Sequence, residues 1–277
     1  MIIDIYQMIL KSYKKNGFIL KKKILTNKEI NSILQMISFN LNRFKKKTNT
    51  EAHTKSWKNK QFTKKIMSFR KKYPKFFSYY YDLVQTNIIL KSITSKKNII
   101  DNVAKLLKIK LSSVSHSNVM VRMDGPHDNK NTYGWHQERS YYNMNSKSGG
   151  IFVWIALVDM TKDIGPLEIC IGSHKSGFIK PKNKKNLKGS LQKIVPEKKV
   201  KKYKNKVISV KMKAGDAIFS NMNTFHKSGK NISDIFRLSL VSRFHDSYSD
   251  DFNSYSDPGD YNYHPYNNLK LKKLGII

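Results

Sequence analysis

The sequence predicts an α+β fold in which helices come first and a sheet of short strands follows. Apolar residues recur at helical spacing in several segments before residue 112, and from about residue 113 the period changes to two. The strand candidates are short and are separated by turns rich in Gly, Asp and Asn. Helices followed by several short strands indicate that the sheet part is a sandwich or a barrel.

Residues 1–112 are expected to be mainly helical around one early strand at 17–20. Thr26 and Glu29 fit a capping box, in which a hydroxyl and a carboxylate each accept a hydrogen bond from a free backbone amide at the start of a helix. Further along, we expect a loop or mobile cover at 46–62, a helix from Pro74 to Ile88 and another helix at 97–108.

The strand part is interrupted at 178–206 by a Lys-, Asn- and Pro-rich segment that we expect to be an insertion loop. We interpret residues 1–277 as a single domain with a helical flank at 1–112, a strand core at 113–245 and a tail at 246–277. After the first strand, which starts near residue 113, the further strand candidates are 150–158, 166–171, 207–212, 217–220 and 235–244.

Composition excludes several classes of protein. A hydrophobic content of 39% with 12% aromatic residues is typical of a folded globule. Cys170 is the only cysteine, which excludes an intrachain disulfide and a thiolate-rich metal site. No apolar run approaches the roughly 18–20 residues that cross a bilayer, and the N-terminus does not resemble a signal peptide. We therefore expect a cytoplasmic protein without a membrane span.

The formal net charge of +34 has two interpretations. A strongly basic surface attracts nucleic acid, anionic lipid or phosphorylated substrates. The alternative is drift in amino-acid usage, because only six of the 53 basic residues are Arg and the chain is also rich in Asn and Ile. Base and phosphate recognition favours Arg, and Lys is scattered through the whole chain. We favour drift, with modest attraction to anions as a by-product.

His136, Glu138 and His226 are candidate metal ligands. His136 and Glu138 are two residues apart in a segment that we interpret as a strand, so we expect their side chains on one face. His226 comes from a distant strand-like segment. A lone His-x-Glu is a weak signal, because such a pair is usually a surface or structural contact. Two histidines with one carboxylate, however, leave one side of a metal open, which suits oxygen-activating non-haem Fe(II).

Six sequence elements strengthen this interpretation when they are taken together and in order. They are Trp135–Glu138, Trp154–Leu157, Gly165–Leu167 leading to Gly172–Lys175, Gly215–Ala217, His226–Asn231 and Arg237. In these elements the chain resembles the phytanoyl-CoA dioxygenase family of Fe(II)/2-oxoglutarate-dependent oxygenases, from Asn16 to about Phe244. The resemblance implies a double-stranded β-helix, which is a jelly-roll barrel, flanked by N-terminal helices and with iron at its open mouth.

The resemblance also implies roles for individual residues. His136, Glu138 and His226 match the iron ligands, and Arg237 matches the arginine that pairs with the distal carboxylate of 2-oxoglutarate. The chain departs from the family pattern at Glu138, where the family usually has Asp. A carboxylate at this position argues against a halogenase, in which a small residue leaves room for chloride. The remaining matches, which line the co-substrate pocket or hold its carboxylate, are Ser228, Trp154 and Met120.

The implied reaction consumes O2 and 2-oxoglutarate, releases succinate and CO2, and by default hydroxylates a C–H bond of a small molecule. The cationic surface favours an anionic substrate. Arg139, Tyr141 and Tyr142 follow the motif and could contact that substrate, although Tyr at a strand end is commonly packing. Two rival functions stay open from the sequence. The runner-up is a Lys-rich nucleic-acid-binding protein, although nucleic acid is not the favoured partner, and the third interpretation is a metal-free jelly-roll binding module.

Overall fold

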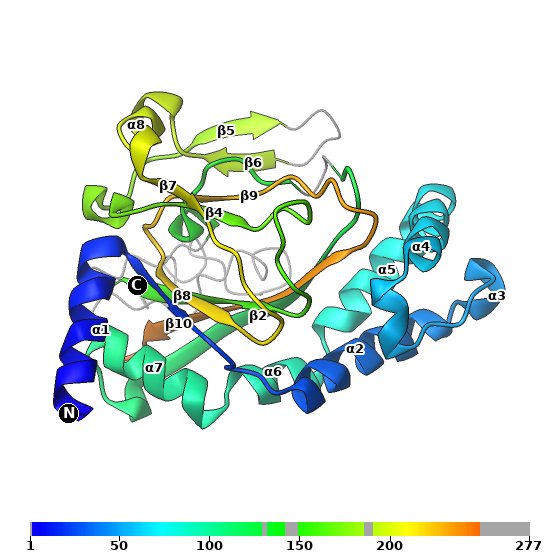
Figure 1. Cartoon of the computed structure of the whole chain (residues 1–277), viewed down its shortest axis with the longest axis horizontal. Coiled ribbons are helices and arrows are strands. Elements are labelled where there is room, and N and C mark those ends of the chain that lie inside the picture. Colours follow the sequence, from blue (N-terminus) through cyan, green and yellow to red (C-terminus); the bar gives the residue numbers. More distant parts are fainter. Residues whose placement is uncertain (1, 129–131, 142–148, 186–190, 250–277) are drawn as a thin grey trace, which may run out of the picture.

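Two antiparallel sheets lie one above the other at the centre of the molecule (Figure 1). The computed structural model describes residues 2–128, 132–141, 149–185 and 191–249. The larger sheet has the order β1-β8-β3-β10-β2, and the smaller has the order β7-β4-β9. Strands β5 and β6 form a separate hairpin. The strands are β1 (Phe18–Lys21), β2 (Val114–Asp124), β3 (Gly150–Ala156), β4 (Leu167–Cys170), β5 (Lys182–Lys185), β6 (Leu191–Ile194), β7 (Val207–Ser209), β8 (Ala217–Asn221), β9 (His226–Ser228) and β10 (Arg237–Asp246).

Helices cover the outer face of the larger sheet, below and to the right in Figure 1. Helices α5, α6 and α7 contact β2, and α7 also contacts β3. Alternate residues of β2, such as Val119 and Val121, are buried in the core that these elements share. The helices are α1 (Ile2–Asn16), α2 (Asn27–Asn42), α3 (Lys45–Thr48), α4 (Lys60–Lys72), α5 (Pro74–Gln85), α6 (Ile88–Thr94), α7 (Lys97–Leu107) and α8 (Glu197–Lys201), with 3-10 turns η1 (Thr54–Lys58), η2 (Leu111–Ser113), η3 (Glu138–Tyr141), η4 (Ser173–Ser176) and η5 (Lys204–Lys206).

The expected capping box at the start of α2 is confirmed. The Glu29 amide donates to Thr26 Oγ1 at 3.3 Å, and the Thr26 amide donates to Glu29 Oε2 at 2.8 Å. The helix that follows buries Ile33, Ile37 and Leu41 completely. The capping signal at the start of α2 and the apolar spacing along it therefore both predict the helix that the structure shows.

The expectation of a loop or mobile cover at 46–62 is wrong. The segment contains the end of α3, all of η1 and the start of α4. The segment is mostly polar, but it includes Trp57, which is fully buried. Trp57 Nε1 donates a hydrogen bond to Ser38 Oγ at 3.0 Å. One buried aromatic residue therefore anchors a segment that is otherwise polar and solvated.

The segment 178–206 is also more regular than the expected insertion loop. It contains the β5–β6 hairpin and α8, which lie at the top of Figure 1. A small second core formed by Cys170, Val195, Val200 and Phe225 connects it to the smaller sheet. The part of the tail beyond residue 249 lies outside the described residues.

The pairing of β10 with β2 and with β3 places residues of these three strands side by side on the inner face of the larger sheet. Met120 of β2 and Trp154 of β3 both pair with Val241 of β10. One end of the same face carries Asp124 opposite Arg237. Strand β9 faces this surface from the smaller sheet, so the space between the sheets is lined by side chains far apart in the sequence.

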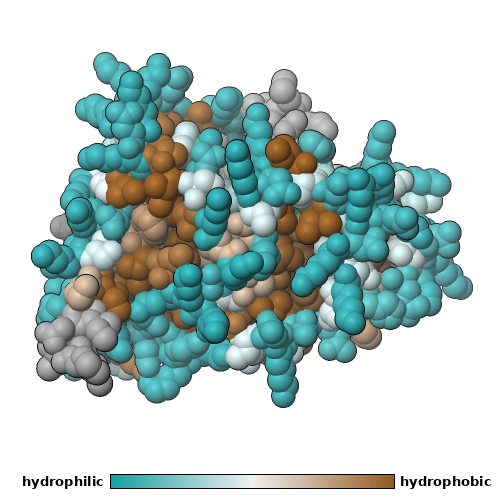
Figure 2. Space-filling view, in the orientation of Figure 1, coloured by the Kyte–Doolittle hydropathy of each residue, from teal (hydrophilic) through white to brown (hydrophobic). Residues whose placement is uncertain are grey.

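The visible face of the molecule is mostly hydrophilic. Figure 2 shows hydrophilic side chains over all parts of this face, with hydrophobic residues exposed between them near the centre. Among the described residues, no helix has both the length and the apolar character needed to cross a membrane.

Candidate metal centre

The two histidines of the predicted site are hydrogen-bonded to each other through their backbones. The His136 amide donates to the His226 carbonyl at 2.9 Å, and the His226 amide donates to the His136 carbonyl at 3.1 Å. His136 makes only this isolated bridge, and Glu138 is the first residue of the 3-10 turn η3. The expectation that His136 and Glu138 share one face of a strand is therefore wrong. The chain turns at Gln137, and this turn brings the carboxylate around to the histidines.

Each imidazole is held in the tautomer that a metal ligand needs. His136 Nδ1 lies 2.7 Å from the Gly134 carbonyl, and His226 Nδ1 lies 2.9 Å from the Thr224 carbonyl. A carbonyl oxygen can only accept, so each Nδ1 carries the proton and donates it. Each Nε2 consequently presents a lone pair to the interior. Fixing the ring through its second nitrogen is the usual arrangement around metal-binding histidines.

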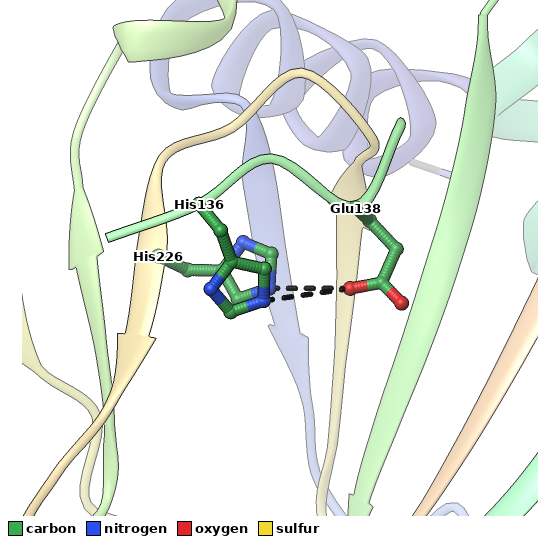
Figure 3. Close-up of side chains that lie close together, drawn as sticks. All are labelled: His136, Glu138 and His226. Carbon is green, nitrogen blue, oxygen red and sulfur yellow. Dashed lines mark ion pairs between the residues drawn. The ribbon is translucent and has the colours of Figure 1, made fainter. Parts of the chain in front are cut away.

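The three expected ligand atoms converge on one point. Figure 3 shows the two imidazoles facing one oxygen of Glu138, while the second oxygen points away. Glu138 Oε2 lies 3.4 Å from His226 Nε2 and 3.9 Å from His136 Nε2. Ligands bound at about 2.1 Å to one ion lie within about 4.2 Å of each other. The three side chains are buried, and this donor set of two nitrogens and one oxygen fits Fe(II).

The surroundings keep these groups in the protonation states that bind a metal. Burial lowers the pKa of His136 to about 3, and the neighbouring His226 imidazole acts in the same direction. Burial alone would raise the pKa of Glu138, but the Arg243 guanidinium and the His226 imidazole hold it well below its usual range. At neutral pH, His136 is therefore neutral and Glu138 is ionised.

Arg243 of β10 holds the second oxygen of Glu138. Its Nε donates to Glu138 Oε1 at 2.7 Å, and its Nη2 donates to the same oxygen. Both side chains are less than 10% exposed. One oxygen of the Glu138 carboxylate is therefore hydrogen-bonded to the Arg243 guanidinium, and the other oxygen faces the two imidazoles.

A cavity of about 160 Å³, partly open to solvent, extends from these ligands along the inner face of the larger sheet. Aromatic side chains form much of its wall, and Tyr133 lies against the His136 ring at 5.5 Å between centroids. The residues that line it include Met120, Arg122, Asp124, Tyr133, Tyr141, Phe152, Trp154, Ser228, Arg237 and Arg243 together with the three ligands.

Two arginines share one carboxylate in this cavity. Arg237 donates to Asp124 Oδ2 from Nε at 3.1 Å and from Nη2 at 2.9 Å. Arg122 donates to Asp124 Oδ1 from Nη2 at 2.8 Å. Burial alone would raise the pKa of Asp124, but the two guanidiniums lower it below its usual range. This group is an anion between two cations, which leaves one positive charge in excess.

The contacts of Arg237 restrict what it can bind. Its Nη1 donates to the carbonyls of Gly165 and Gly229, and one edge of its fork is taken by Asp124. Only one Nη2 hydrogen is without a partner among the described residues. A bidentate contact between Arg237 and a ligand carboxylate is therefore not available while Asp124 stays in place.

The other expected co-substrate residues lie in the same cavity. Trp154 and Met120 line its wall in register with Val241. Ser228 also lines it, two residues after His226 on β9. These residues and the ligands are thus brought together from both sheets.

The three expected substrate residues differ in position. Tyr141 lines the cavity, with its ring 5.7 Å from that of His136, and its hydroxyl accepts a hydrogen bond from the Lys193 amide at 3.1 Å. The guanidinium of Arg139 lies instead over the Phe178 ring, and Arg139 is not part of the cavity wall. Tyr142 lies outside the described residues.

The sequence interpretation missed Arg122, Asp124 and Arg243. The alternation along β2 carries a usable signal, because Arg122 and Asp124 have the same parity as Met120. The scarcity of arginine is a second signal, because three of the six arginines in the chain line this cavity. Gln137 was also missed: it is fully buried and joins three segments, through bonds to the carbonyls of Gly177 and Asn223 and from the Ile179 amide.

The family of the chain follows from a comparison with family models. The model described as Phytanoyl-CoA dioxygenase (PhyH) matches residues 13–239. The chain belongs to this family, as its motifs indicated. It is a non-haem oxygenase that uses iron and 2-oxoglutarate, with the His-x-Glu and distant His arrangement described above. Among curated proteins, none matches the sequence.

Solved structures share the fold at low sequence identity. The epimerase SnoN, in complex with Fe3+, alpha ketoglutarate and nogalamycin RO, is similar with a TM-score of 0.61 and 13% identity, over 91% of this chain and 88% of that chain. The non-heme monooxygenase ThoJ has a TM-score of 0.59 and 17% identity, over 86% and 77%. EctD from S. alaskensis with bound Fe has a TM-score of 0.54 and 14% identity, over 86% and 75%. The expected double-stranded β-helix with N-terminal helices is confirmed.

Proposed function

We propose that this oxygenase hydroxylates a C–H bond of a small anionic metabolite and releases succinate and CO2, with His136, Glu138 and His226 as its iron ligands. One observation carries the proposal. The three ligand atoms converge in a buried cavity that also contains two arginines around one carboxylate. A metal-binding group and an anion-binding group in one cavity are the two parts that a chelating dicarboxylate requires.

When bound at these ligands, Fe(II) supplies the redox chemistry that couples oxidative decarboxylation of 2-oxoglutarate by O2 to oxidation of the substrate. The chain supplies orientation and a shielded site. Tyr133, Phe152 and Trp154 form apolar walls that keep water away from the reacting atoms. His136, Glu138 and His226 would hold the metal through three donor atoms and would leave further positions for the co-substrate.

The distal carboxylate of 2-oxoglutarate is assigned to Arg237, with Arg122 as a second cation and Ser228 as a hydroxyl donor. Arg237 contributes its remaining Nη2 hydrogen. The excess positive charge of the Arg122–Asp124–Arg237 group attracts the carboxylate electrostatically, and this attraction is strong in a buried cavity. Trp154 and Met120 would pack against the carbon chain of the co-substrate.

The charge of the cavity also supports an anionic substrate. Its wall contains three guanidiniums against two carboxylates, and the His136 imidazole is neutral. Tyr141, beside the His136 ring, is the residue of the expected substrate set that is placed to contact it.

The test is an anaerobic reconstitution with Fe(II) and 2-oxoglutarate, followed by visible spectroscopy. Wild type is expected to show the weak charge-transfer band of the chelate, and His226→Ala is expected to lack it. Succinate release over a panel of anionic and neutral metabolites then identifies the substrate. A folded wild-type protein without the band, or turnover only of neutral metabolites, would contradict the corresponding part of the proposal.

A further inference from the structure

Arg243 enters the cavity by the regular alternation of β10, because it has the same parity as Arg237 and Val241, which also line the cavity. Strand β10 stays in continuous register with β3, where Arg243 pairs with Phe152. The register shift against β2 leaves Ser117 of β2 as the extra residue, so it does not change the parity of β10. The cavity wall includes both Arg243 and Phe152, so the guanidinium lies on the side of the barrel that carries the ligands.

The guanidinium contacts one oxygen of Glu138 and leaves the other. Nε and Nη2 of Arg243 both donate to Oε1, whereas Oε2 faces His226 Nε2 at 3.4 Å and His136 Nε2 at 3.9 Å. The two other arginines of the cavity, Arg122 and Arg237, pair with Asp124 instead. The contact between Arg243 and Glu138 is therefore specific within the cavity.

We infer that Arg243 is a positioning residue that assigns the two oxygens of Glu138, Oε1 to itself and Oε2 to the metal, and that glutamate is the carboxylate whose length matches this arginine. The inference rests on the proposed ligand set. Two charge-assisted hydrogen bonds to one oxygen fix the last torsion of the glutamate side chain, which is otherwise a broad, roughly two-fold rotor.

The extra methylene of glutamate is what makes this division possible. An aspartate at position 138 would withdraw the carboxylate by about one C–C bond, roughly 1.5 Å. At that distance one carboxylate cannot keep both the 2.7 Å bond to Arg243 Nε and the approach to the two imidazoles. The departure from the usual Asp and the presence of Arg243 are therefore two parts of one arrangement.

The division also fixes how many metal positions the carboxylate uses. With Oε1 held by Arg243, Glu138 binds through one oxygen only, so the three protein ligands use three positions and leave three. A carboxylate free to rotate could bind through both oxygens and take a position needed by the co-substrate. Arg243 would thus protect the open half of the site.

A purely structural role of Arg243, as counter-charge to a buried carboxylate, makes different predictions. If Arg243 had only this role, its replacement would lower the stability of the metal-free protein. The metal affinity and the chelate spectrum of the folded fraction would stay unchanged. Metal affinity and spectrum, measured beside stability, therefore separate the two roles.

The experiment compares Arg243→Gln, Arg243→Lys, Glu138→Asp and the double variant Arg243→Gln/Glu138→Asp. Arg43→Gln, at an exposed arginine at the end of α2, is the matched control. Affinity for Mn(II) is measured by anaerobic calorimetry, and the Fe(II)·2-oxoglutarate band is recorded for each protein. We expect Arg243→Gln to bind metal about 10- to 100-fold more weakly, as is typical when a group that orients a ligand is removed, with a shifted band. Arg243→Lys should recover part of the loss.

The double variant tests the matched length. If Glu138→Asp already breaks the contact, the added Arg243→Gln change should weaken binding only slightly further, so the two losses are not additive. Wild-type affinity and an unshifted band in folded Arg243→Gln, or strictly additive losses, would overturn the inference. If Arg243→Gln does not fold, Arg243→Lys and Glu138→Asp decide by the same two readouts. Failure of wild type to bind metal would instead refute the proposed ligand set.

Discussion

Asp124 and Arg237 are paired directly across β2 and β10, and Arg237 donates two hydrogen bonds to a single oxygen of this aspartate, at 3.1 and 2.9 Å. Arg122 donates to the second oxygen from the same strand as Asp124. One buried carboxylate thus holds two buried guanidiniums at fixed positions. We therefore expect the stability of the protein to depend on the occupation of the proposed co-substrate site.

Replacing Asp124 by Asn should strongly destabilise the free protein. Two guanidiniums would then be buried without their anion, and breaking a buried ion pair in this way typically costs about 3–5 kcal/mol of unfolding free energy. Because 2-oxoglutarate supplies a new carboxylate, the added co-substrate should raise the Tm of Asp124→Asn more than that of wild type. Thermal unfolding with and without 2-oxoglutarate and Mn(II) measures both effects.

Asp234→Asn is the control for this prediction, since Asp234 is 63% exposed and pairs with Lys60 at the surface. Exposed pairs contribute at most about 1 kcal/mol. Equal stability of Asp124→Asn and Asp234→Asn would show that the two cavity arginines do not depend on Asp124.

Arg122→Gln should weaken the binding of 2-oxoglutarate while the metal affinity stays close to that of wild type. A charge-assisted hydrogen bond contributes about 1.5–3 kcal/mol, which corresponds to about a 10- to 150-fold rise in the Kd of the co-substrate. Titration of the Fe(II) protein with 2-oxoglutarate, followed at the charge-transfer band, gives this constant. An unchanged Kd would remove Arg122 from the co-substrate site.

His245 should make the folded protein sensitive to mild acid. The residue is 1% exposed, and neither of its ring nitrogens has a hydrogen-bond partner among the residues that the structure describes. Burial lowers the pKa of His245 to about 3, and the charges of Arg243 and Arg139 act in the same direction. An unfolded histidine titrates near 6.5, so between about pH 6.5 and 3 the unfolded chain binds a proton that the folded chain does not. The free energy of unfolding must therefore fall as the pH falls through this window.

Urea unfolding at pH 7 and pH 5 checks this sign. For one such histidine the expected loss between the two values is about 2 kcal/mol, and His245→Phe should remove that share of the loss. The exposed His53 provides the control variant His53→Gln, which should keep the wild-type pH dependence. A His245→Phe protein with the wild-type difference between pH 7 and pH 5 would contradict the assignment.

Gly17→Ala should disturb both stability and metal binding. Gly17 has a φ of +86°, and an added Cβ would lie 2.4 Å from His174 Nδ1 and 2.8 Å from Thr224 Oγ1. The Thr224 hydroxyl donates to the Gly17 carbonyl at 3.0 Å, and the Thr224 carbonyl holds the His226 ring. Backbone strain and crowding together should cost about 2–4 kcal/mol, with a weaker affinity for Mn(II).

The matched control is Gly172→Ala. Gly172 also has a positive φ, +75°, but an added Cβ there meets only the Lys15 carbonyl at 3.4 Å, which is ordinary contact. This variant should lose only about 1–2 kcal/mol from its left-handed backbone and should keep its metal affinity. Chemical denaturation and calorimetry on both variants separate crowding near Thr224 from backbone strain alone.

Much of the fold could be predicted because local signals agree with the final structure. The capping box at Thr26 and the period-two segment that became β2 both gave correct elements. The prediction for the segment around Trp57 was wrong because this segment is held in place by one indole that is buried against distant residues. Local composition does not reveal such a contact. The prediction of a loop at 178–206 was wrong for a similar reason, because a small core that includes Phe225 stabilises the strands and the helix of this segment.

The candidate site was predictable at the level of its motif and less so in its geometry. The sequence identified His136, Glu138 and His226, which the structure brings together. It did not reveal the turn at Gln137 that directs Glu138 toward them, because an His-x-Glu segment reads equally well as a strand. Arg243 has the same parity along β10 as Arg237, but the sequence does not show that its guanidinium lies beside Glu138, which comes from a distant segment.

The pair of backbone hydrogen bonds between His136 and His226 has a consequence for how the enzyme acquires its metal. The backbone hydrogen bonds fix the spacing of the two residues, and the bonds from Nδ1 to the Gly134 and Thr224 carbonyls orient the two rings, so the chain itself positions both imidazoles. Loading then requires little ordering of the chain, so most of the intrinsic affinity of two nitrogens and one oxygen is available for capture of the ion.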